Sequence, residues 1–300
     1  MAPSQPKPIH RRLFVVGCSR SGTTLAQRFL EAHSRVHSFP ETGVFLRALG
    51  MRGRLLPWVR LGLTAGKERR ALERLLTPSK GGEGPKPDLP PHRILLRRSI
   101  SDVVGVLDEL AALAEADVWV EKTPRHVFHA IRITKMVPRS VCIHMVRDGR
   151  DVVASVVDRA RRFPDRFPRQ REPNYGIRQW NRSMAATEAA MRRKGQVAVL
   201  YEALASDPET TLRTLCRALG LEYEDTMLDP PADPVFVTED EPWKSQVTGP
   251  VSPARSKFAE VFDDATGVWI QDRLNRGFFR EIEERTSGES GGVWVSGEGL

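Results

Sequence analysis

Residues 17–24, Gly-Cys-Ser-Arg-Ser-Gly-Thr-Thr, have the types and spacing of a phosphate-binding loop. The two glycines match the Gly-x-x-x-x-Gly spacing of a P-loop, in which backbone amides and the start of the following helix hold a phosphate. Thr23 stands where that motif requires the lysine that reaches the β- and γ-phosphates of ATP. Arg20 instead places a cation inside the loop, where it can stabilise negative charge that develops on a bridging oxygen.

A second candidate anion site follows the apolar run at 140–146. Arg147 stands at the end of this predicted strand, and Ser155 comes eight positions later, about two turns into a predicted helix. Because open α/β sheets bind ligands at the carboxyl ends of their strands, this cation and this hydroxyl can converge on one anion. A surface ion pair between Arg147 and Asp151 is the alternative interpretation.

The elements that would position these loops alternate between strands and helices. Short apolar runs predict the strands, and an apolar period of 3.6 residues predicts the helices. We predict strands over 12–17, 118–120, 140–146 and 196–201, and helices over 24–32, 125–136, 174–194 and 208–219. This alternation is typical of an α/β fold with a central, mostly parallel sheet flanked by helices. We expect one P-loop-like domain over 9–285, disordered tails at 1–8 and 286–300, and a surface loop at 79–91.

Composition narrows the classes of function. The chain has 300 residues and a formal net charge of +8, which favours anionic partners without choosing among nucleotides, acidic substrates, nucleic acid and membrane surfaces. Its three cysteines are widely spaced among apolar residues, and neither a signal-peptide pattern nor a run of about 18 apolar residues is present. We therefore expect a cytoplasmic protein with reduced thiols.

Both anion motifs resemble those of the sulfotransferases that use 3′-phosphoadenosine-5′-phosphosulfate (PAPS). The family's first signature is a strand followed by Gly-x-x-[Arg/Lys]-Ser-Gly-Thr-Thr. Its second is a strand followed by Arg-Asp, with a serine eight positions after the arginine. The resemblance implies that Arg147 and Ser155 bind the 3′-phosphate, which ATP lacks. It also implies that five residues bind the 5′-phosphosulfate: Arg20, Ser21, Gly22, Thr23 and Thr24. The pattern is more similar to bacterial members and tyrosylprotein sulfotransferases than to cytosolic animal enzymes.

The same resemblance implies further site residues. Lys122 begins a Lys-Thr-Pro segment that lines the cleft in similar sulfotransferases, where the lysine helps to neutralise the transferred sulfuryl group. Tyr201 follows a predicted strand and would lie near the nucleotide. A late basic residue covers the 3′-phosphate in the family. Lys257 resembles it, although Lys244 and Arg255 compete for that role.

Glu41 is the predicted general base. After the helix at 24–32 the chain can return to the carboxyl edge of the sheet and bring Glu41 beside Arg20, within reach of an acceptor hydroxyl. In tyrosylprotein sulfotransferases a glutamate stands twenty-one positions after the loop arginine, as Glu41 does after Arg20. His126 is the alternative base, because the cytosolic animal enzymes use histidine. No carboxylate or cysteine stands at ligand spacing from His126 and His129, so we expect no metal site.

Together these residues predict a PAPS-dependent sulfotransferase in which Arg20 and Lys122 stabilise transfer, Glu41 is the base and no metal takes part. A nucleoside or small-molecule kinase is the alternative, disfavoured by the missing lysine. A nucleic-acid-binding module is disfavoured because no reading motif is present. The basic segments 47–80 and 159–171 are either solvated faces or the flanks of a cleft for an anionic acceptor. The sequence leaves open a peptide tyrosine, a glycan, a lipid or a small molecule as acceptor, and also homodimerisation and peripheral membrane contact.

Overall fold

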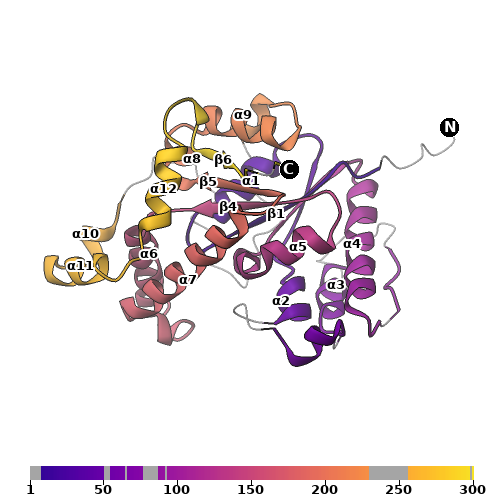
Figure 1. The fold of residues 1–300 in the computed structure, drawn as a ribbon, viewed down its shortest axis with the longest axis horizontal. Coiled ribbons are helices and arrows are strands. Elements are labelled where there is room, and N and C mark those ends of the chain that lie inside the picture. Colours follow the sequence, from indigo (N-terminus) through magenta and orange to yellow (C-terminus); the bar gives the residue numbers. More distant parts are fainter. Residues whose placement is uncertain are drawn as a thin grey trace.

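The computed structural model describes residues 8–50, 55–64, 66–76, 87–91, 93–229, 256–297 and 299–300. Their centre is a sheet with the strand order β2-β3-β1-β4-β5-β6 (Figure 1). The strands are β1 Arg11–Gly17, β2 Val36–Phe39, β3 Val118–Lys122, β4 Ser140–Val146, β5 Gln196–Leu200 and β6 Val293–Val295. Neighbouring strands from β2 to β5 are parallel, and β6 is antiparallel to β5. The predicted α/β fold with a mostly parallel sheet is confirmed.

The strand order fixes where a ligand can bind. Within the sheet, β2 and β3 lie on one side of β1, and β4 and β5, which come later in the chain, lie on its other side. The carboxyl edge between β1 and β4 is therefore a topological switch point, the place where open α/β sheets bind ligands. Gly17 lies opposite Met145 in the register of these two strands, so the loops after β1 and β4 begin side by side.

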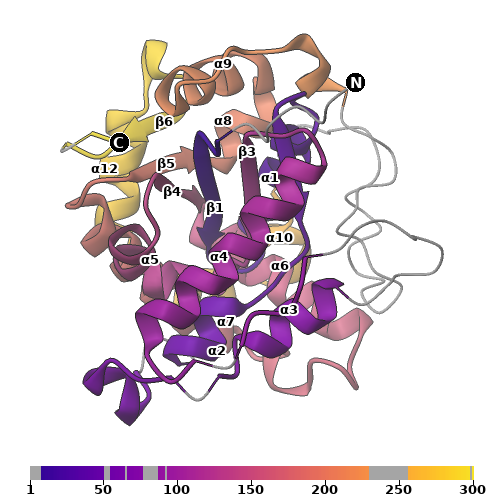
Figure 2. The same cartoon turned by 90° about the vertical axis from the view of Figure 1, so that its right-hand side faces the viewer.

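Helices cover both faces of the sheet (Figures 1 and 2). One face packs against α1 Thr23–Glu31, α8 Tyr201–Ser206 and α9 Pro208–Leu219. The other face packs against α2 Val44–Leu49, α4 Leu96–Leu113, α5 Ala130–Met136, α6 Gly149–Arg162, α7 Pro173–Met191 and α12 Gly277–Arg285. The remaining α-helices are α3 Arg69–Leu76, α10 Phe258–Val261 and α11 Asp264–Gln271. None of the helices in the described ranges is both long and apolar enough to cross a membrane.

Two predictions about local structure need correction. The helix predicted over 125–136 begins as the 3-10 helix η3 Pro124–His129 and becomes α-helical only at Ala130. The segment 286–300 was expected to be disordered, but β6 lies within it, so the folded chain extends past residue 285. Val293 is buried and Trp294 packs against Phe278, so the open edge of β5 gives this glycine-rich segment a partner that its composition does not reveal. Residues 1–7 and most of the predicted loop at 79–91 lie outside the described residues.

Candidate active site

The loop after β1 is packed so closely that glycine is required at both of its ends. A Cβ on Gly17 would lie 2.5 Å from the backbone oxygen of Met145 in β4, and a Cβ on Gly22 would lie 2.3 Å from the ring of Tyr201. Gly22 also has a φ of 87°, in the left-handed region that favours glycine. The Ser21 hydroxyl donates to the backbone oxygen of Cys18 at 2.6 Å and closes the turn. The loop at 17–22 is therefore closely packed between β4 and Tyr201.

Helix α1 leaves this loop with an open amino-terminal end. Gly22 is its N-cap, no side chain caps the first turn, and that turn contains no acidic residue. The first N–H groups of an α-helix have no partner within the helix and carry the positive end of its dipole. Thr23 and Thr24, the first two residues of the helix, line the adjacent cavity. The local structure therefore suits a bound phosphate or sulfate.

The loop after β4 meets the loop after β1 through Arg147. Its guanidinium lies 4.2 Å above the centre of the Tyr201 ring, and its Nη1 donates to the backbone oxygen of Arg20 at 3.3 Å. The Arg147 Nε is buried and has no hydrogen-bond partner among the residues that the structure describes. Because a buried N–H without a partner is costly, this donor is suited to an anion that binds beside it.

Ser155 joins the two predicted phosphate sites. It stands on the second turn of α6, which begins after Asp148 caps the helix by accepting from the Arg150 amide at 2.8 Å. The Ser155 hydroxyl accepts a hydrogen bond from the Arg20 Nε at 3.0 Å. The structure thus brings the cation of the first motif and the hydroxyl of the second within contact distance, although 135 positions separate them in the sequence.

Positive charge accumulates around this junction. Burial, followed by the nearby guanidiniums of Arg159, Arg147 and Arg162, lowers the pKa of Arg20 to about 10. Arg20 is therefore still a cation at neutral pH, but it is less stable as one than an exposed arginine. Asp158 acts in the opposite direction, and it is already paired with Arg162. An anionic ligand would relieve this repulsion, so the electrostatics favour binding of a phosphate or sulfate group.

Glu41 follows strand β2 and lines a cavity of about 350 Å³. Arg20, Thr23 and Thr24 line the same cavity. Its Oε1 accepts a hydrogen bond from the Nζ of Lys122, the last residue of β3. The Lys122 side chain is only 1% exposed, whereas that of Glu41 is 35% exposed. The structure thus brings together all three residues predicted to be catalytic. One member of the ion pair is fixed by the sheet, and the other faces the cavity.

Glu121, the residue before Lys122, forms buried hydrogen bonds that anchor the segment next to Glu41. Its carboxylate is fully buried and accepts hydrogen bonds from the amide and the hydroxyl of Thr42 at 2.9 and 2.8 Å, and from the Thr123 hydroxyl at 2.5 Å. Burial acts to raise the pKa of Glu121, but His126 and these hydrogen bonds outweigh it, so the pKa is lowered. An ionised Glu121 therefore anchors Thr42, the neighbour of Glu41.

His126 is not placed to act as the base. Its ring is fully buried, its Nε2 accepts from the Phe45 amide at 3.3 Å, and its Nδ1 lies 3.1 Å from the Glu121 carboxylate. Since Nε2 accepts, the proton of the neutral ring belongs on Nδ1, which donates to Glu121. His129 is also buried and bonds the backbone oxygen of Gly50 at 2.7 Å, so the two histidines do not face one ligand. Within the described part of the chain, no three His, Cys, Asp or Glu side chains form a metal-binding group.

Lys257 lies beside α6, on the side of the second motif. Its Nζ is 3.8 Å from the Asp158 carboxylate, and the neighbouring Ser256 hydroxyl donates to Asp151 at 2.6 Å. Lys257 therefore lies close to Ser155, which precedes Asp158 by one helical turn. The competing candidates Lys244 and Arg255 lie outside the described residues.

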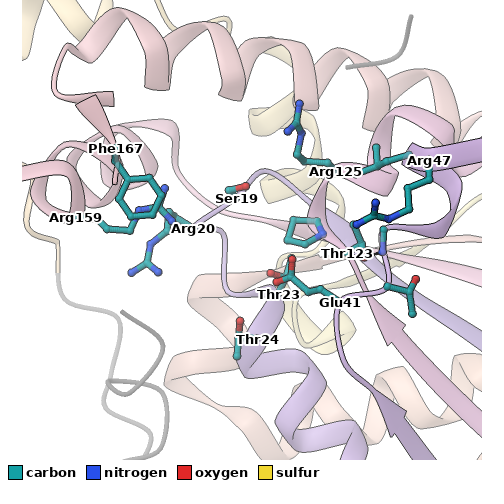
Figure 3. Close-up of a pocket in the computed structure, with 14 residues that line it drawn as sticks. Ser19, Arg20, Thr23, Thr24, Glu41, Arg47, Thr123, Arg125, Arg159 and Phe167 are labelled. Atoms are coloured by element: carbon teal, nitrogen blue, oxygen red, sulfur yellow. Dashed lines mark hydrogen bonds between the residues drawn. The ribbon is translucent and has the colours of Figure 1, made fainter. Parts of the chain in front are cut away.

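Arginines on the cavity wall complete the site. Figure 3 shows Arg159 and Phe167 on one side of the cavity and Arg47 and Arg125 on the other, with Glu41 between them. The guanidinium of Arg159 lies 4.2 Å above the ring of Phe167 and donates to Gln170. Arg47, Arg159 and Phe167 belong to the two basic segments, 47–80 and 159–171. The sequence did not show which of the many cations in these segments line the cavity. Arg125 was not assigned to the site, although it follows the Lys-Thr-Pro segment.

A sequence model of the sulfotransferase family matches residues 12–225, more than half of the chain. The chain belongs to the sulfotransferase family. It is 25% identical over 219 residues to protein-tyrosine sulfotransferase 2 of Gallus gallus, and 28% identical over 232 residues to protein-tyrosine sulfotransferase 1 of Danio rerio. Each match covers 72% of this chain, but only 53% and 55% of the relatives. The chain thus spans about half the length of these proteins.

Two solved structures share the fold of this sulfotransferase-family chain. The sulfotransferase domain from the curacin biosynthetic pathway has a TM-score of 0.56 at 18% identity, with coverage of 94% of this chain and 99% of that domain. The sulfotransferase domain from the Synechococcus PCC 7002 olefin synthase has a TM-score of 0.53 at 17% identity, with coverage of 91% and 96%. At these identities the likeness concerns the fold alone, and it agrees with the P-loop-like architecture expected from the sequence.

Proposed function

We propose that the chain transfers a sulfuryl group from PAPS to an acceptor hydroxyl. The observation that carries this proposal is the junction of two anion-binding loops at the switch point between β1 and β4. Arg20 contacts Ser155 there, and Arg147 contacts the backbone of Arg20. The junction opens beside the cavity that contains Glu41. A nucleotide with phosphates at both its 3′ and 5′ positions needs two such loops close together.

The residues at the junction fit the two phosphates of PAPS. The closely packed loop and the uncapped start of α1 suit the 5′-phosphosulfate, with Arg20, Ser21, Gly22, Thr23 and Thr24 as its ligands. The buried, unpartnered Nε of Arg147 and the Ser155 hydroxyl suit the 3′-phosphate. Tyr201, against which both Gly22 and Arg147 pack, would position the two loops relative to the nucleotide, and Lys257 would cover the 3′-phosphate.

Sulfuryl transfer breaks the bond from sulfur to the bridging oxygen, forms a bond from sulfur to the acceptor oxygen, and releases the hydroxyl proton. We assign the proton to Glu41, whose carboxylate faces the cavity. Arg20 and Lys122 stabilise the negative charge that develops as the bond to the bridging oxygen breaks. The ion pair from Lys122 keeps the Glu41 carboxylate next to the end of β3, close to where that charge develops.

The acceptor is expected to carry negative charge near its hydroxyl. Arg47, Arg125 and Arg159 line the cavity around Glu41, and Phe167 offers an aromatic face. Cations favour an anionic ligand, and an aromatic wall favours a flat or apolar group. A tyrosine in an acidic peptide fits both features, and so does a phenol that bears an acidic group.

The test measures transfer of labelled sulfate from PAPS to such acceptors by the wild type, by Glu41→Gln and by Glu109→Gln, an exposed glutamate on α4 that serves as the control. Glu41→Gln keeps the shape of the side chain and removes the base, so transfer should fall by about 10²-fold or more, and binding of 3′-phosphoadenosine-5′-phosphate should be unchanged. Normal transfer by Glu41→Gln would remove Glu41 from the mechanism. Phosphoryl transfer from ATP and magnesium, without transfer from PAPS, would favour the kinase alternative.

A further inference from the structure

A second hollow lies at the amino-terminal edge of the sheet, opposite the candidate active site. Its volume is about 450 Å³. It is lined by five cationic side chains: Arg11, Lys135, Arg139, Arg193 and Lys194. These cations come from segments far apart in the sequence. They lie together because the parallel strands β1, β4 and β5 all begin at this edge. The fold therefore gathers five positive charges around one concave surface.

Among the described residues, no Asp or Glu side chain lines this hollow, and Leu300, the last residue of the sequence, is one of its lining residues. Within the described residues, none of its five cations forms an ion pair, whereas the adjacent Arg12 and Arg192 pair with Asp108 and Glu188. The Nε of Arg11 is buried and has no hydrogen-bond partner in the described part of the chain. Arg139 donates from Nη1 to the backbone oxygen of Ile9 at 3.0 Å, which orients its side chain without neutralising its charge.

The ends of helices explain only part of this charge. Lys135 lies in the last turn of α5, and Arg193 and Lys194 follow the end of α7, so helix dipoles favour cations at these positions. Arg139 follows the end of α5 at the same spacing as Lys194 follows the end of α7, whereas Arg11 is the first residue of β1 and does not belong to a helix end. Five like charges around a hollow repel one another unless an anion lies between them.

We propose that this hollow binds a compact polyanion, a small ligand with two or more phosphate or sulfate groups. Its volume is within the usual range of small-molecule sites, and a concave surface suits a compact ligand better than a flat membrane surface. Guanidinium groups from Arg11, Arg139 and Arg193 can donate in pairs to the oxygens of such groups. The hollow lies at the edge of the sheet opposite Arg20, so this ligand is distinct from the nucleotide of the proposed reaction.

The experiment titrates tripolyphosphate by calorimetry into proteins that all carry Arg20→Ala, which weakens binding at the phosphate loop. The edge variant adds Arg11→Gln, Arg193→Gln and Lys194→Gln. A control variant adds Arg60→Gln, Arg97→Gln and Arg98→Gln, which remove the same charge from exposed positions elsewhere. Thermal melts show whether each protein is folded, and titrations at two salt concentrations report the electrostatic contribution.

We expect the control variant to bind tripolyphosphate as the Arg20→Ala parent does, more weakly at higher salt, and the edge variant to bind it at least about tenfold more weakly. Each charged hydrogen bond that is lost contributes about that factor. The absence of binding to the parent would overturn the proposal, as would equal weakening in the two variants. Binding of duplex DNA or anionic vesicles that depends on the edge residues, without binding of tripolyphosphate, would also overturn it in favour of an extended polyelectrolyte partner.

Discussion

Replacement of Arg147 by alanine tests whether the second loop recognises the 3′-phosphate. The guanidinium stacks on Tyr201 at 4.2 Å, and its buried Nε has no partner within the described ranges. A charged hydrogen bond to a phosphate contributes about 1.5 to 3 kcal/mol, so the dissociation constant of 3′-phosphoadenosine-5′-phosphate should rise by about 10- to 150-fold. The affinity for AMP, which has no 3′-phosphate, should change little. The free energy of unfolding should fall by the lost stacking on Tyr201 and the lost hydrogen bond to the backbone of Arg20, about 1 kcal/mol for each.

Calorimetry with both nucleotides and chemical denaturation would measure these quantities in the wild type, Arg147→Ala, Arg147→Lys and Arg273→Ala. Arg273 stacks on Trp269 at 4.3 Å and is the matched control, because its loss removes a similar stacking contact away from the site. Arg147→Lys keeps the charge without the forked donors, so its affinity should be intermediate. Equal affinity of the wild type for the two nucleotides, or equal weakening of both by Arg147→Ala, would refute the assignment.

Three further predictions concern the loop, acid stability and metals. Gly22→Ala should abolish nucleotide binding in calorimetry, because its Cβ would clash with Tyr201. The control Gly62→Ala has a similar φ of 73° and no described atom within 4 Å of its Cβ, so it should leave binding intact. Equal nucleotide binding by the two variants would contradict the packing argument. Burial lowers the pKa of His144 to about 4 from about 6.5 in the unfolded chain, so its contribution to stability is present above pH 6.5 and is lost as the pH falls towards 4. Denaturation at pH 7 and pH 5 should differ by roughly 2 kcal/mol more in the wild type than in His144→Gln, and an unchanged pH dependence would exclude this origin. Addition of a chelator should leave the rate of sulfuryl transfer unchanged, and a loss that magnesium restores would place a metal in the mechanism.

The sequence was sufficient where local patterns are strong. The run from Leu13 to Gly17 is apolar because β1 is buried on both faces, so its strand character could be read directly from residue types. The two predicted anion motifs follow β1 and β4, and each is a short segment that can be recognised without the rest of the fold. The strands β2 and β6 were not among the predicted strands, and the helix predicted over 125–136 begins as the 3-10 helix η3. The pairing of β6 depends on the open edge of β5, which its own residues do not reveal.

The motifs, together with their resemblance to PAPS-dependent sulfotransferases, predicted that Arg20, Arg147, Lys122 and Glu41 belong to one site, but they did not predict how these residues touch. The contact of Arg20 with Ser155 and the ion pair of Lys122 with Glu41 join residues 135 and 81 positions apart. Only the strand order brings those segments to one edge of the sheet. The hollow at the opposite edge was not apparent from the sequence, because its five cations are dispersed over nearly two hundred positions and each one alone resembles an ordinary surface residue. Chemical identity is thus a local property of the sequence, whereas the meeting of distant charges depends on which strands lie side by side.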